Sequence, residues 1–581
     1  MKASDYLVQF CVDNEIDKVF GYIGGAVAHI YHSIAKNSHI EIINGICEQG
    51  SAFAAEGYAR ISGKTGVVIA TSGPGATNLI TSIGSCFFDS VPLLCITGQV
   101  NTYEFKYDKG CRQVGFQETD IVSIVKPIVK YAVMVDKVEN LRYELEKAYF
   151  LANFNRKGPV LIDIPMNIQR AEFDFNKANS FWDSQEYMKL QKANKKSKLF
   201  LEEIDCEFRC SISPIILIGG GVRSMRAREL VKHFLSESKL PVVHSLMAKD
   251  VIESGYELNL GLIGSYGNRS ANLALANSDL ILVLGSRLDT RQTGTDLKRF
   301  AANAKIIQVD IDENELGAKI EIDIKILCDV EVFLEKLILL NLKLNCEKWK
   351  DWLLKIKSKF PINQDINNNI KVENSLIEAI SNCQYAKNVC VDVGQHQMWV
   401  AQSFKISEDV RVLFSGGMGA MGFALPCAIG AICANGENTI AIVGDGGFQM
   451  NIQELEVIKR RNLPIKIFVF NNQNLGMVRQ FQEIYFEKKY LGTIQDYSAP
   501  DFKKIAEAYG IKSREVKKID NFLSVLEEVF SSSEPEVINI ILENRFTNVE
   551  PKMIVGRPIE DMYPFIEAKE LKTLMFNRGK K

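Results

Sequence analysis

Val-Gly-Asp-Gly-Gly-Phe, residues 443–448, is the stretch from which the fold of this chain is predicted. A second stretch, Phe-Asn-Asn at residues 470–472, belongs with it. The apolar run before Gly444 has the character of a buried strand, and a second apolar run ends at Phe470. Helical spacing between the runs predicts a strand-helix-strand unit with parallel strands. Asp445 and Asn472 are therefore expected at neighbouring strand ends, where open α/β sheets bind ligands.

Side chains at these strand ends predict a clamp for a metal-bound diphosphate. The carboxylate of Asp445 and oxygen atoms of Asn472 and Asn474 are hard ligands, which suit Mg²⁺ that leaves other positions to phosphate and water. Three glycines would let backbone N–H groups approach phosphate oxygens: Gly444, Gly446 and Gly447. A Gly-Asp-Gly turn alone is more often an ordinary loop, and only its pairing with Asn-Asn about 25 residues later favours the functional interpretation.

Size and composition limit the classes of protein to consider. With 581 residues, 46% of them apolar and 24% charged, the chain can form about three domains. A net charge of −2, without a basic stretch interleaved with aromatics, argues against a nucleic-acid partner. The apolar runs have strand length and the first residues lack signal-peptide features, so we expect no membrane association and a cytoplasmic location. The 13 cysteines lack metal-binding spacing and are expected to be reduced.

Alternating strand and helix patterns predict three α/β domains. In the first domain, predicted strands include residues 40–44 and 65–70, and the latter runs into a glycine turn. Polar stretches rich in Lys and Asn, or in Lys and Trp, separate the domains. The expected boundaries are 1–171, 205–340 and 370–550 for the domains, 172–204 and 341–369 for the linkers, and 551–581 for a C-terminal tail.

The combination of GDGG with Asn-Asn resembles the signature of thiamine diphosphate enzymes. This resemblance implies three doubly wound parallel-sheet domains: pyrimidine-binding, central FAD-type and diphosphate-binding. Glu48 follows a predicted strand and starts a helix of small residues, where a carboxylate alone is more often only a helix-start residue. In the family one glutamate hydrogen-bonds the aminopyrimidine ring of the cofactor, and the resemblance gives this role to Glu48. The cofactor itself performs the carbanion chemistry.

The string RQVGFQETD, residues 112–120, is similar to the loop that acetolactate synthases place over the reacting carbon. The resemblance implies that Gln117 orients the substrate and that Phe116 walls the pocket. Arg291 matches an arginine that pairs with the acceptor carboxylate, and Phe481 occupies a position that influences acceptor size. The implied reaction is decarboxylation of pyruvate and transfer of its two-carbon unit to an acceptor carbonyl.

The same resemblance extends to the cofactor sites. Met421 matches the residue that bends thiamine diphosphate, although such a methionine is usually core filler. Further positions on the diphosphate side are Gly394, Gln395, His396, Gly419 and Met477. FAD in a non-redox role is expected at Gly220, Arg223, Arg287, Asp289, Asp310 and Asp329. Many thiamine diphosphate enzymes keep this domain without flavin, and the triple glycine alone is weak evidence for a dinucleotide.

Several acceptor-side positions depart from typical acetolactate synthases. Phe481 replaces a usual Trp, Thr290 a usual Asp, and Ser265-Tyr266 a usual Met-His. Residues 556–564 instead resemble acetolactate synthase-like proteins of surface-polysaccharide pathways, including the yersiniose type. The acceptor therefore stays open between a 2-keto acid and a nucleotide-linked keto sugar, whereas a simple decarboxylase, an oxidase or a non-catalytic binding protein fits less well. In this superfamily the first and third domains meet across a subunit boundary, which implies a homodimer or homotetramer.

Overall fold

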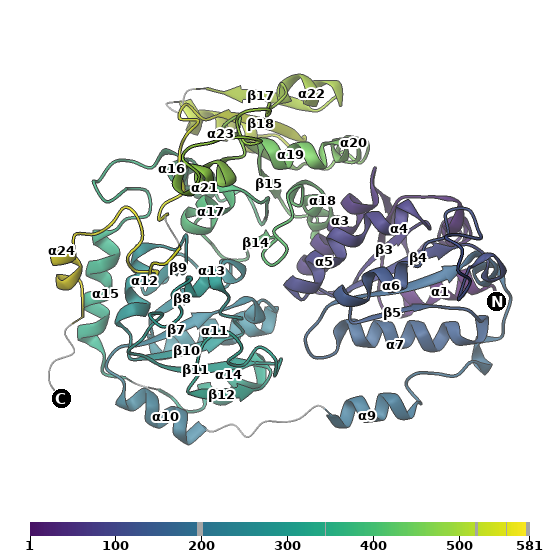
Figure 1. Cartoon of the computed structure of the whole chain (residues 1–581), viewed down its shortest axis with the longest axis horizontal. Helices are drawn as coiled ribbons and strands as arrows, with labels where there is room; N and C mark the ends of the chain where they lie inside the picture. Colours follow the sequence, from purple (N-terminus) through teal and green to yellow (C-terminus); the bar gives the residue numbers. More distant parts are fainter. Residues whose placement is uncertain (194–200, 343, 518–520, 553–554, 577–581) are drawn as a thin grey trace.

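The computed structural model describes residues 1–193, 201–342, 344–517, 521–552 and 555–576, so parts of the predicted linker 172–204 and tail 551–581 lie outside the described residues. The described residues form three six-stranded sheets in which all paired strands are parallel. The predicted α/β class with three parallel-sheet domains is confirmed. Figure 1 shows the first and central domains on opposite sides, with the third domain above and between them.

The first and third sheets share one topology. The first has the order β2-β1-β3-β4-β6-β5, and the third repeats it as β14-β13-β15-β16-β18-β17. The strands of the first sheet are β1 (Lys18–Gly21), β2 (Glu41–Asn44), β3 (Gly66–Ala70), β4 (Leu93–Gln99), β5 (Tyr131–Met134) and β6 (Pro159–Pro165). Those of the third are β13 (Asn388–Val391), β14 (Arg411–Phe414), β15 (Thr439–Gly444), β16 (Lys466–Asn471), β17 (Lys512–Val516) and β18 (Glu536–Ile541). In each sheet the chain changes direction between the first and third strands, and such switch points are where open sheets bind ligands.

The central sheet has the strand order of dinucleotide-binding domains. Its order is β12-β11-β10-β7-β8-β9, which places the switch point between β7 and β10. The strands are β7 (Pro214–Ile218), β8 (Val242–His244), β9 (Asn259–Leu262), β10 (Leu280–Leu284), β11 (Lys305–Asp310) and β12 (Ile324–Leu327).

Helices cover both faces of the sheets. In and after the first domain they are α1 (Ala3–Asp13), α2 (Ala28–Ala35), α3 (Glu48–Ser62), α4 (Pro74–Asn78), α5 (Ile80–Asp89), α6 (Ile121–Val125), α7 (Leu141–Asn153), α8 (Met166–Arg170), α9 (Gln185–Ala193) and α10 (Leu201–Cys210). The central domain carries α11 (Met225–Ser238), α12 (Arg269–Asn277), α13 (Thr290–Thr293), α14 (Val330–Ile338) and α15 (Glu347–Lys359). The third domain and tail carry α16 (Val372–Asn382), α17 (Gln395–Ser403), α18 (Ala424–Asn435), α19 (Asp445–Met450), α20 (Leu455–Arg460), α21 (Gly476–Tyr485), α22 (Phe502–Ala508), α23 (Phe522–Ser531) and α24 (Ala568–Thr573). Among these described helices, none combines the length and apolar character needed to cross a bilayer.

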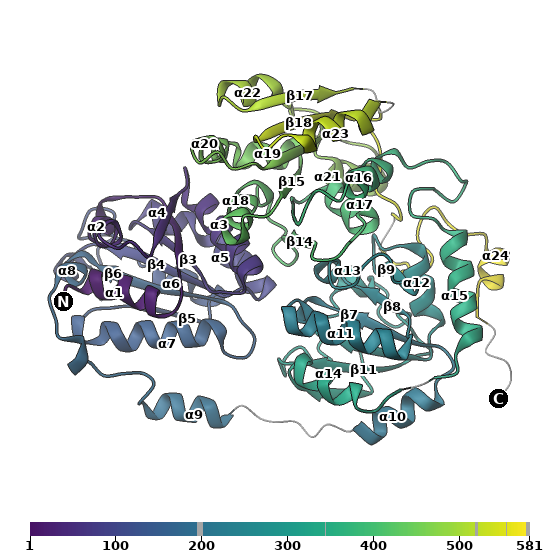
Figure 2. The same ribbon diagram turned by 180° about the vertical axis from the view of Figure 1, so that it is seen from behind.

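The first and third domains share one hydrophobic core. Figures 1 and 2 show α3 and α18 side by side between the two sheets. A Cβ atom at Gly57 would lie 2.3 Å from the carbonyl oxygen of Cys427, and one at Gly430 would lie 1.7 Å from that of Ala54. Only glycine permits such close approach of the two backbones. The helix that begins at Glu48 is thereby fixed to the third domain of the same chain.

Segments that the sequence presents as linker and tail complete the central domain. Trp349 of α15 is fully buried, and its indole Nε1 donates to the carbonyl of Pro214 at 3.0 Å. Ile559 and Met562 of the tail are buried in the same cluster. Asn272 of α12 donates to the carbonyl of Ile559 at 2.9 Å, which ties the tail to the domain.

Candidate active site

Two neighbouring strands deliver the residues of the predicted metal clamp. β15 ends at Gly444 and Asp445 begins α19, while its partner β16 ends directly before Asn472. Asp445 is 3% exposed, and burial raises the pKa of its carboxyl to about 7. Among the described residues, neither Oδ2 of Asp445 nor Oδ1 of Asn474 has a hydrogen-bond partner. Two buried, unpaired oxygen atoms beside a glycine-rich strand end fit a divalent cation that carries a diphosphate.

Asn472 is held in place by its neighbours. Its Nδ2 donates to Oε1 of Gln395 at 3.1 Å, and its Oδ1 accepts from the backbone N–H of Asn474 at 3.1 Å. Nε2 of Gln395 donates to Oε1 of Gln480 at 3.1 Å and to the carbonyl of Thr547 at 2.8 Å. Both N–H groups of Gln395 are thus engaged. In this arrangement Gln395 supports Asn472, and its direct contact with a phosphate stays a prediction.

His396 lies against Gly394 and Gly444. We call the predicted diphosphate site, with Gly444, Asp445, Gly446, Gly447 and Asn472, the cradle. A Cβ atom at Gly394 would lie 2.7 Å from Cε1 of His396, and one at Gly444 would lie 3.0 Å from it. Burial lowers the pKa of this imidazole to about 3, so it is neutral at physiological pH. Its Nε2 is buried and has no partner within the described part of the chain. Because β13 and β15 flank the switch point, His396 can offer this nitrogen to a ligand held by Asp445.

Met421 lies in the loop between β14 and α18. A Cβ atom at Gly446 would lie 3.3 Å from Cε of Met421, so the thioether side chain reaches the cradle. The next residue, Gly422, donates its N–H to Asp392 at 3.0 Å and accepts from Nδ2 of Asn451 at 2.8 Å. Gly419 turns the loop with a φ of 64°. The position of Met421 is therefore fixed from both sides.

Glu48 occupies the corresponding edge of the first sheet. Its side chain is 8% exposed, and its Oε2 accepts a hydrogen bond from Nδ2 of Asn78 at 2.9 Å. A Cβ atom at Gly75, in the glycine turn after β3, would lie 3.0 Å from Oε1 of Glu48. The carboxylate is thus enclosed by its own domain.

The loop at residues 112–120 is organised by Glu118. Its carboxylate accepts backbone N–H groups of Lys106, Val114 and Gly115 at 2.8, 2.6 and 3.1 Å. Gln117 adopts a left-handed φ of 63°, and Phe116 is 86% exposed. A large aromatic side chain with this exposure is left almost uncovered by the described part of the chain.

Arg291 belongs to α13, which Asp289 caps by accepting the N–H of Arg291 at 3.0 Å. Burial raises the pKa of Tyr266, while the charge of Arg291 lowers it and Tyr485 raises it further. Arg291, Tyr266 and Tyr485 are therefore close enough to interact electrostatically. Phe481 of α21 is 42% exposed, and its ring centroid lies 4.7 Å from that of Tyr485. These contacts bring the acceptor-side residues of two domains to one area.

Met477 lies one turn before Phe481 on α21, so the two side chains project from the same side of the helix. It packs against the buried core of the third domain, whereas Phe481 of the same helix remains half exposed. Met477 thus lies between the core of the third domain and the half-exposed Phe481, and its contact with the cofactor stays a prediction.

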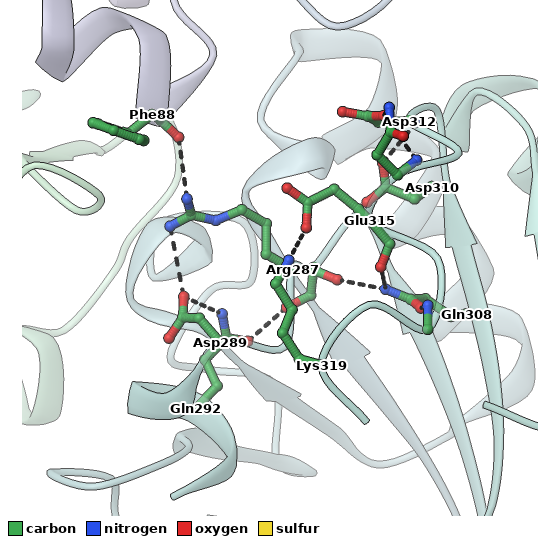
Figure 3. Close-up of polar contacts among 12 residues, drawn as sticks. Phe88, Arg287, Asp289, Gln292, Gln308, Asp310, Asp312, Glu315 and Lys319 are labelled. Atoms are coloured by element: carbon green, nitrogen blue, oxygen red, sulfur yellow. Dashed lines mark hydrogen bonds and ion pairs between the residues drawn. The ribbon is translucent and has the colours of Figure 1, made fainter. Parts of the chain in front are cut away.

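Three of the predicted flavin residues, Arg287, Asp289 and Asp310, follow the neighbouring strands β10 and β11 of the central sheet (Figure 3). After β7, Gly220 accepts from Nε of Arg223 at 2.9 Å, and Nη2 of Arg223 donates to the carbonyl of Asp89 at 2.7 Å. After β10, Arg287 lies 3.5 Å from both the carbonyl of Phe88 and the carboxylate of Asp289. Both arginines thus connect the central domain to the end of α5.

Two further carboxylates follow the next strands. Burial raises the pKa of Asp310, at the end of β11, to about 6. Its Oδ1 accepts the backbone N–H of Asp312 at 2.9 Å, and a carboxylate has further acceptor capacity that suits a ribose hydroxyl. Asp329 caps α14 by accepting the N–H of Glu331 at 2.8 Å. The acidic strand end, next to the closely approaching glycines after β7 and β10, fits a dinucleotide.

Comparison with known proteins agrees with this geometry. Three family models match, described as thiamine pyrophosphate enzyme: the N-terminal TPP binding domain at residues 1–124, the central domain at 209–337 and the C-terminal TPP binding domain at 392–540. The acetolactate synthase large subunit of Lactococcus lactis subsp. lactis is 36% identical, with 96% of both chains covered. The large subunit of acetolactate synthase isozyme 2 from Escherichia coli is 33% identical, covering 97% of this chain and 99% of that protein. The acetolactate synthase large subunit of Cyanidium caldarium is 35% identical, with 98% and 97% covered.

The chain belongs to the acetolactate synthase large-subunit family. This membership confirms both the resemblance seen in the sequence and the prediction of a thiamine diphosphate enzyme. Thiamine diphosphate, Mg²⁺ and FAD are the cofactors of this enzyme family, and the oxygens of Asp445 and Asn474 that lack a partner in the described part of the chain fit the first two.

Several residues of this acetolactate synthase family member lie near the predicted sites although the sequence pattern did not single them out. The hydroxyl of Tyr497 would lie 3.3 Å from a Cβ atom at Gly446. Arg156 of the first domain donates to Asp312 and Glu315 at 3.0 and 2.8 Å, beside Asp310. None of them occurs at a recognisable strand end, and only the tertiary structure brings them there.

Proposed function

We propose that this chain decarboxylates pyruvate and transfers the two-carbon unit to a 2-keto acid, forming acetolactate when the acceptor is pyruvate. The observation that carries the proposal is the buried Oδ2 of Asp445 at a sheet switch point, which has no hydrogen-bond partner among the described residues. It occurs in a chain of which 96% aligns with an acetolactate synthase large subunit. Assaying acetolactate after incubation with pyruvate and the three cofactors tests it.

Each side chain has a definable task in this reaction. Bound thiamine diphosphate supplies the centre that stabilises a carbanion. Asp445, Asn472 and Asn474 would hold Mg²⁺ and the diphosphate, and Nε2 of His396 would bond a phosphate oxygen. Glu48 would hold a proton at the aminopyrimidine ring, since a buried carboxylate that Asn78 holds in place can take up and release a proton without leaving its position. Met421 would keep the two rings of the cofactor bent.

The substrate side would be built from two domains. Gln117 would orient pyruvate under Phe116, and Arg291 would bind the carboxylate of the acceptor through its guanidinium fork. The neighbouring Tyr266 and the aromatic side chains of α21 would line the same pocket.

A keto sugar is the second candidate acceptor. Several acceptor-side residues, including Tyr266 and Thr290, differ from those usual in acetolactate synthases. Phe481 on the same side is only half covered. Both observations favour this second acceptor. A bulky nucleotide-linked substrate would need such an altered pocket.

The variant Phe481→Trp tests the acceptor side. We expect the preference for 2-ketobutyrate over pyruvate as acceptor to rise about tenfold, because a larger apolar surface would contact the additional methyl group. The product ratio in a competition assay measures this preference. Leu523→Ala, a change at an exposed position of α23 in the same domain, should leave the ratio unaltered. An unaltered ratio in Phe481→Trp would remove this position from the acceptor site.

We propose FAD as a cofactor without a redox role, bound at Gly220, Arg223, Arg287, Asp289, Asp310 and Asp329. The strand order of the central sheet and the free acceptor capacity of Asp310 support this assignment.

The predicted domain limits 1–171, 205–340 and 370–550 are proposed as the functional units. The thirteen cysteines are all unpaired, which suits a reducing compartment such as the cytoplasm.

We propose a homodimer or homotetramer with the active site between subunits. Glu48 is enclosed by residues of its own domain, and Asp445 by residues of the third domain. Tyr103 and Phe116 of the first domain are 68% and 86% exposed, and Val478 of α21 is 53% exposed. A second copy that covers these apolar side chains would complete the pocket.

Mixed dimers test this arrangement. A hybrid of one Glu48→Gln chain and one Asp445→Asn chain contains one site with both changes and one intact site if the two residues come from different subunits. We expect about half of the wild-type turnover per hybrid, although both parent dimers are inactive. Chains with different affinity tags allow the hybrid to be isolated. A hybrid as inactive as its parents would place both residues of each site in one chain.

A further inference from the structure

The start of α3 is held by a residue of the third domain. The N-cap of the helix, Cys47, makes no side-chain capping bond. Oε1 of Glu454 accepts the backbone N–H groups of Ile46 and Cys47, each at 3.2 Å. Glu454 lies in the third domain and is only 1% exposed. It thus supplies, across 408 positions, the acceptor that the turn before α3 lacks.

Two glycines leave room for this carboxylate. A Cβ atom at Gly50, in the first turn of α3, would lie 2.5 Å from Oε1 of Glu454. One at Gly45 would lie 3.4 Å from Oε2. The carboxylate therefore rests directly against the turn and the helix start on either side of Glu48.

The burial of Glu454 has a cost that an apolar residue would avoid. Burial raises the pKa of its carboxyl to about 7, while the two backbone N–H groups lower it, and Glu456 and Arg460 act in opposite directions. An apolar side chain would, however, leave the N–H groups of Ile46 and Cys47 unpaired. The arrangement fixes the direction in which the backbone enters α3.

We propose that Glu454 is a positioning residue for Glu48, which holds the turn before α3 so that the Glu48 carboxylate keeps its place at the cofactor ring. The inference rests on the proposed function of Glu48. A misplacement of about 1 Å at a reacting group costs on the order of 100-fold in rate, so a rigid support matters for catalysis more than for folding.

The same stretch of chain also supports the cofactor cradle. Asp445 begins α19, Asn451 bonds the carbonyl of Gly422 beside Met421, and Glu454 ends the short helix at Ile452–Glu454. If the active sites lie between subunits, this stretch holds the metal ligand of one site and the glutamate support of another.

Three variants test the inference. Glu454→Ala removes the acceptor, Glu454→Gln keeps one acceptor oxygen, and Gly50→Ala displaces the carboxylate with a methyl group while leaving it in the chain. We expect Glu454→Ala to lower kcat about 100-fold, with KM for pyruvate and Kd for thiamine diphosphate changed less than about threefold. Glu454→Gln should recover most of kcat, and Gly50→Ala should lose kcat as Glu454→Ala does.

A structural readout accompanies the kinetics. Amide hydrogen exchange of residues 46–51 in the cofactor-free protein should accelerate in Glu454→Ala and Gly50→Ala. Asp501→Ala, which removes the solvent-exposed cap of α22, is the control and should leave kcat unchanged. In a Glu48→Gln background, Glu454→Ala should cause no further loss, because its effect passes through Glu48.

The outcomes separate the inference from the proposed function. Three outcomes would each overturn the positioning role. They are full activity of Glu454→Ala, an additional loss when Glu454→Ala is placed in the Glu48→Gln background, and an equal loss of kcat in Asp501→Ala. If Glu454→Ala does not fold, unchanged kcat in Gly50→Ala would overturn it as well. Full activity of Glu48→Gln would instead contradict the proposed function.

Discussion

Glu48→Gln is expected to lower the turnover of pyruvate about 1,000-fold, a loss typical of removing a positioned acid-base group. Glutamine has the same size and can still bond Asn78, but it cannot hold and release a proton. Affinity for thiamine diphosphate should change less than about threefold, since the diphosphate and metal are held by the third domain. Steady-state kinetics and a cofactor titration by tryptophan fluorescence measure both quantities.

The control is Glu41→Gln, which removes a carboxylate of the same domain from two exposed ion pairs, with Lys18 and Arg461. Its turnover should stay within about twofold of wild type, because exposed ion pairs contribute little. Residual activity above about a tenth of wild type in Glu48→Gln would refute the proton-relay role.

Asp445→Asn is expected to weaken binding of Mg²⁺ and thiamine diphosphate at least 100-fold, or about 2.7 kcal/mol, because the variant loses the charged metal ligand. The cofactor-free variant should be as stable as wild type or more stable. Burial raises the pKa of Asp445 to about 7, and its Oδ2 is unpaired within the described residues, so the free protein keeps this carboxylate at a cost.

Cofactor titration and thermal unfolding of the same preparations check these two expectations. Glu437→Gln, an exposed change in the same domain, serves as the control for both measurements. A variant that binds the cofactors with wild-type affinity would exclude Asp445 as the metal ligand. A large drop in unfolding temperature would show a structural role instead.

The sheets and their switch points were predictable because short apolar runs bounded by glycine form buried parallel strands. The strand predicted at residues 65–70 is observed at Gly66–Ala70, and Asp445 and Asn472 do end paired strands. Parallel strand ends meet at one edge, so the pattern along the chain already indicated the cradle.

Other features depend on contacts between distant segments. Trp349 lies in a polar stretch that reads as a linker, yet it is fully buried against β7. Both N–H groups of Gln395 bond within the domain, which no local pattern indicates. Glu454 occurs in a helical segment like any surface glutamate, and only the packing of α3 on the third domain gives it its partners.

The most direct test of the central claim is the product formed from pyruvate. Purified protein would be incubated with thiamine diphosphate, Mg²⁺, FAD and pyruvate, and acetolactate would be measured beside pyruvate consumption. The proposed function predicts rapid formation of acetolactate, one molecule for every two of pyruvate consumed. Slow consumption without acetolactate, accelerated by a nucleotide-linked keto sugar, would contradict the 2-keto acid acceptor and establish the sugar as the acceptor.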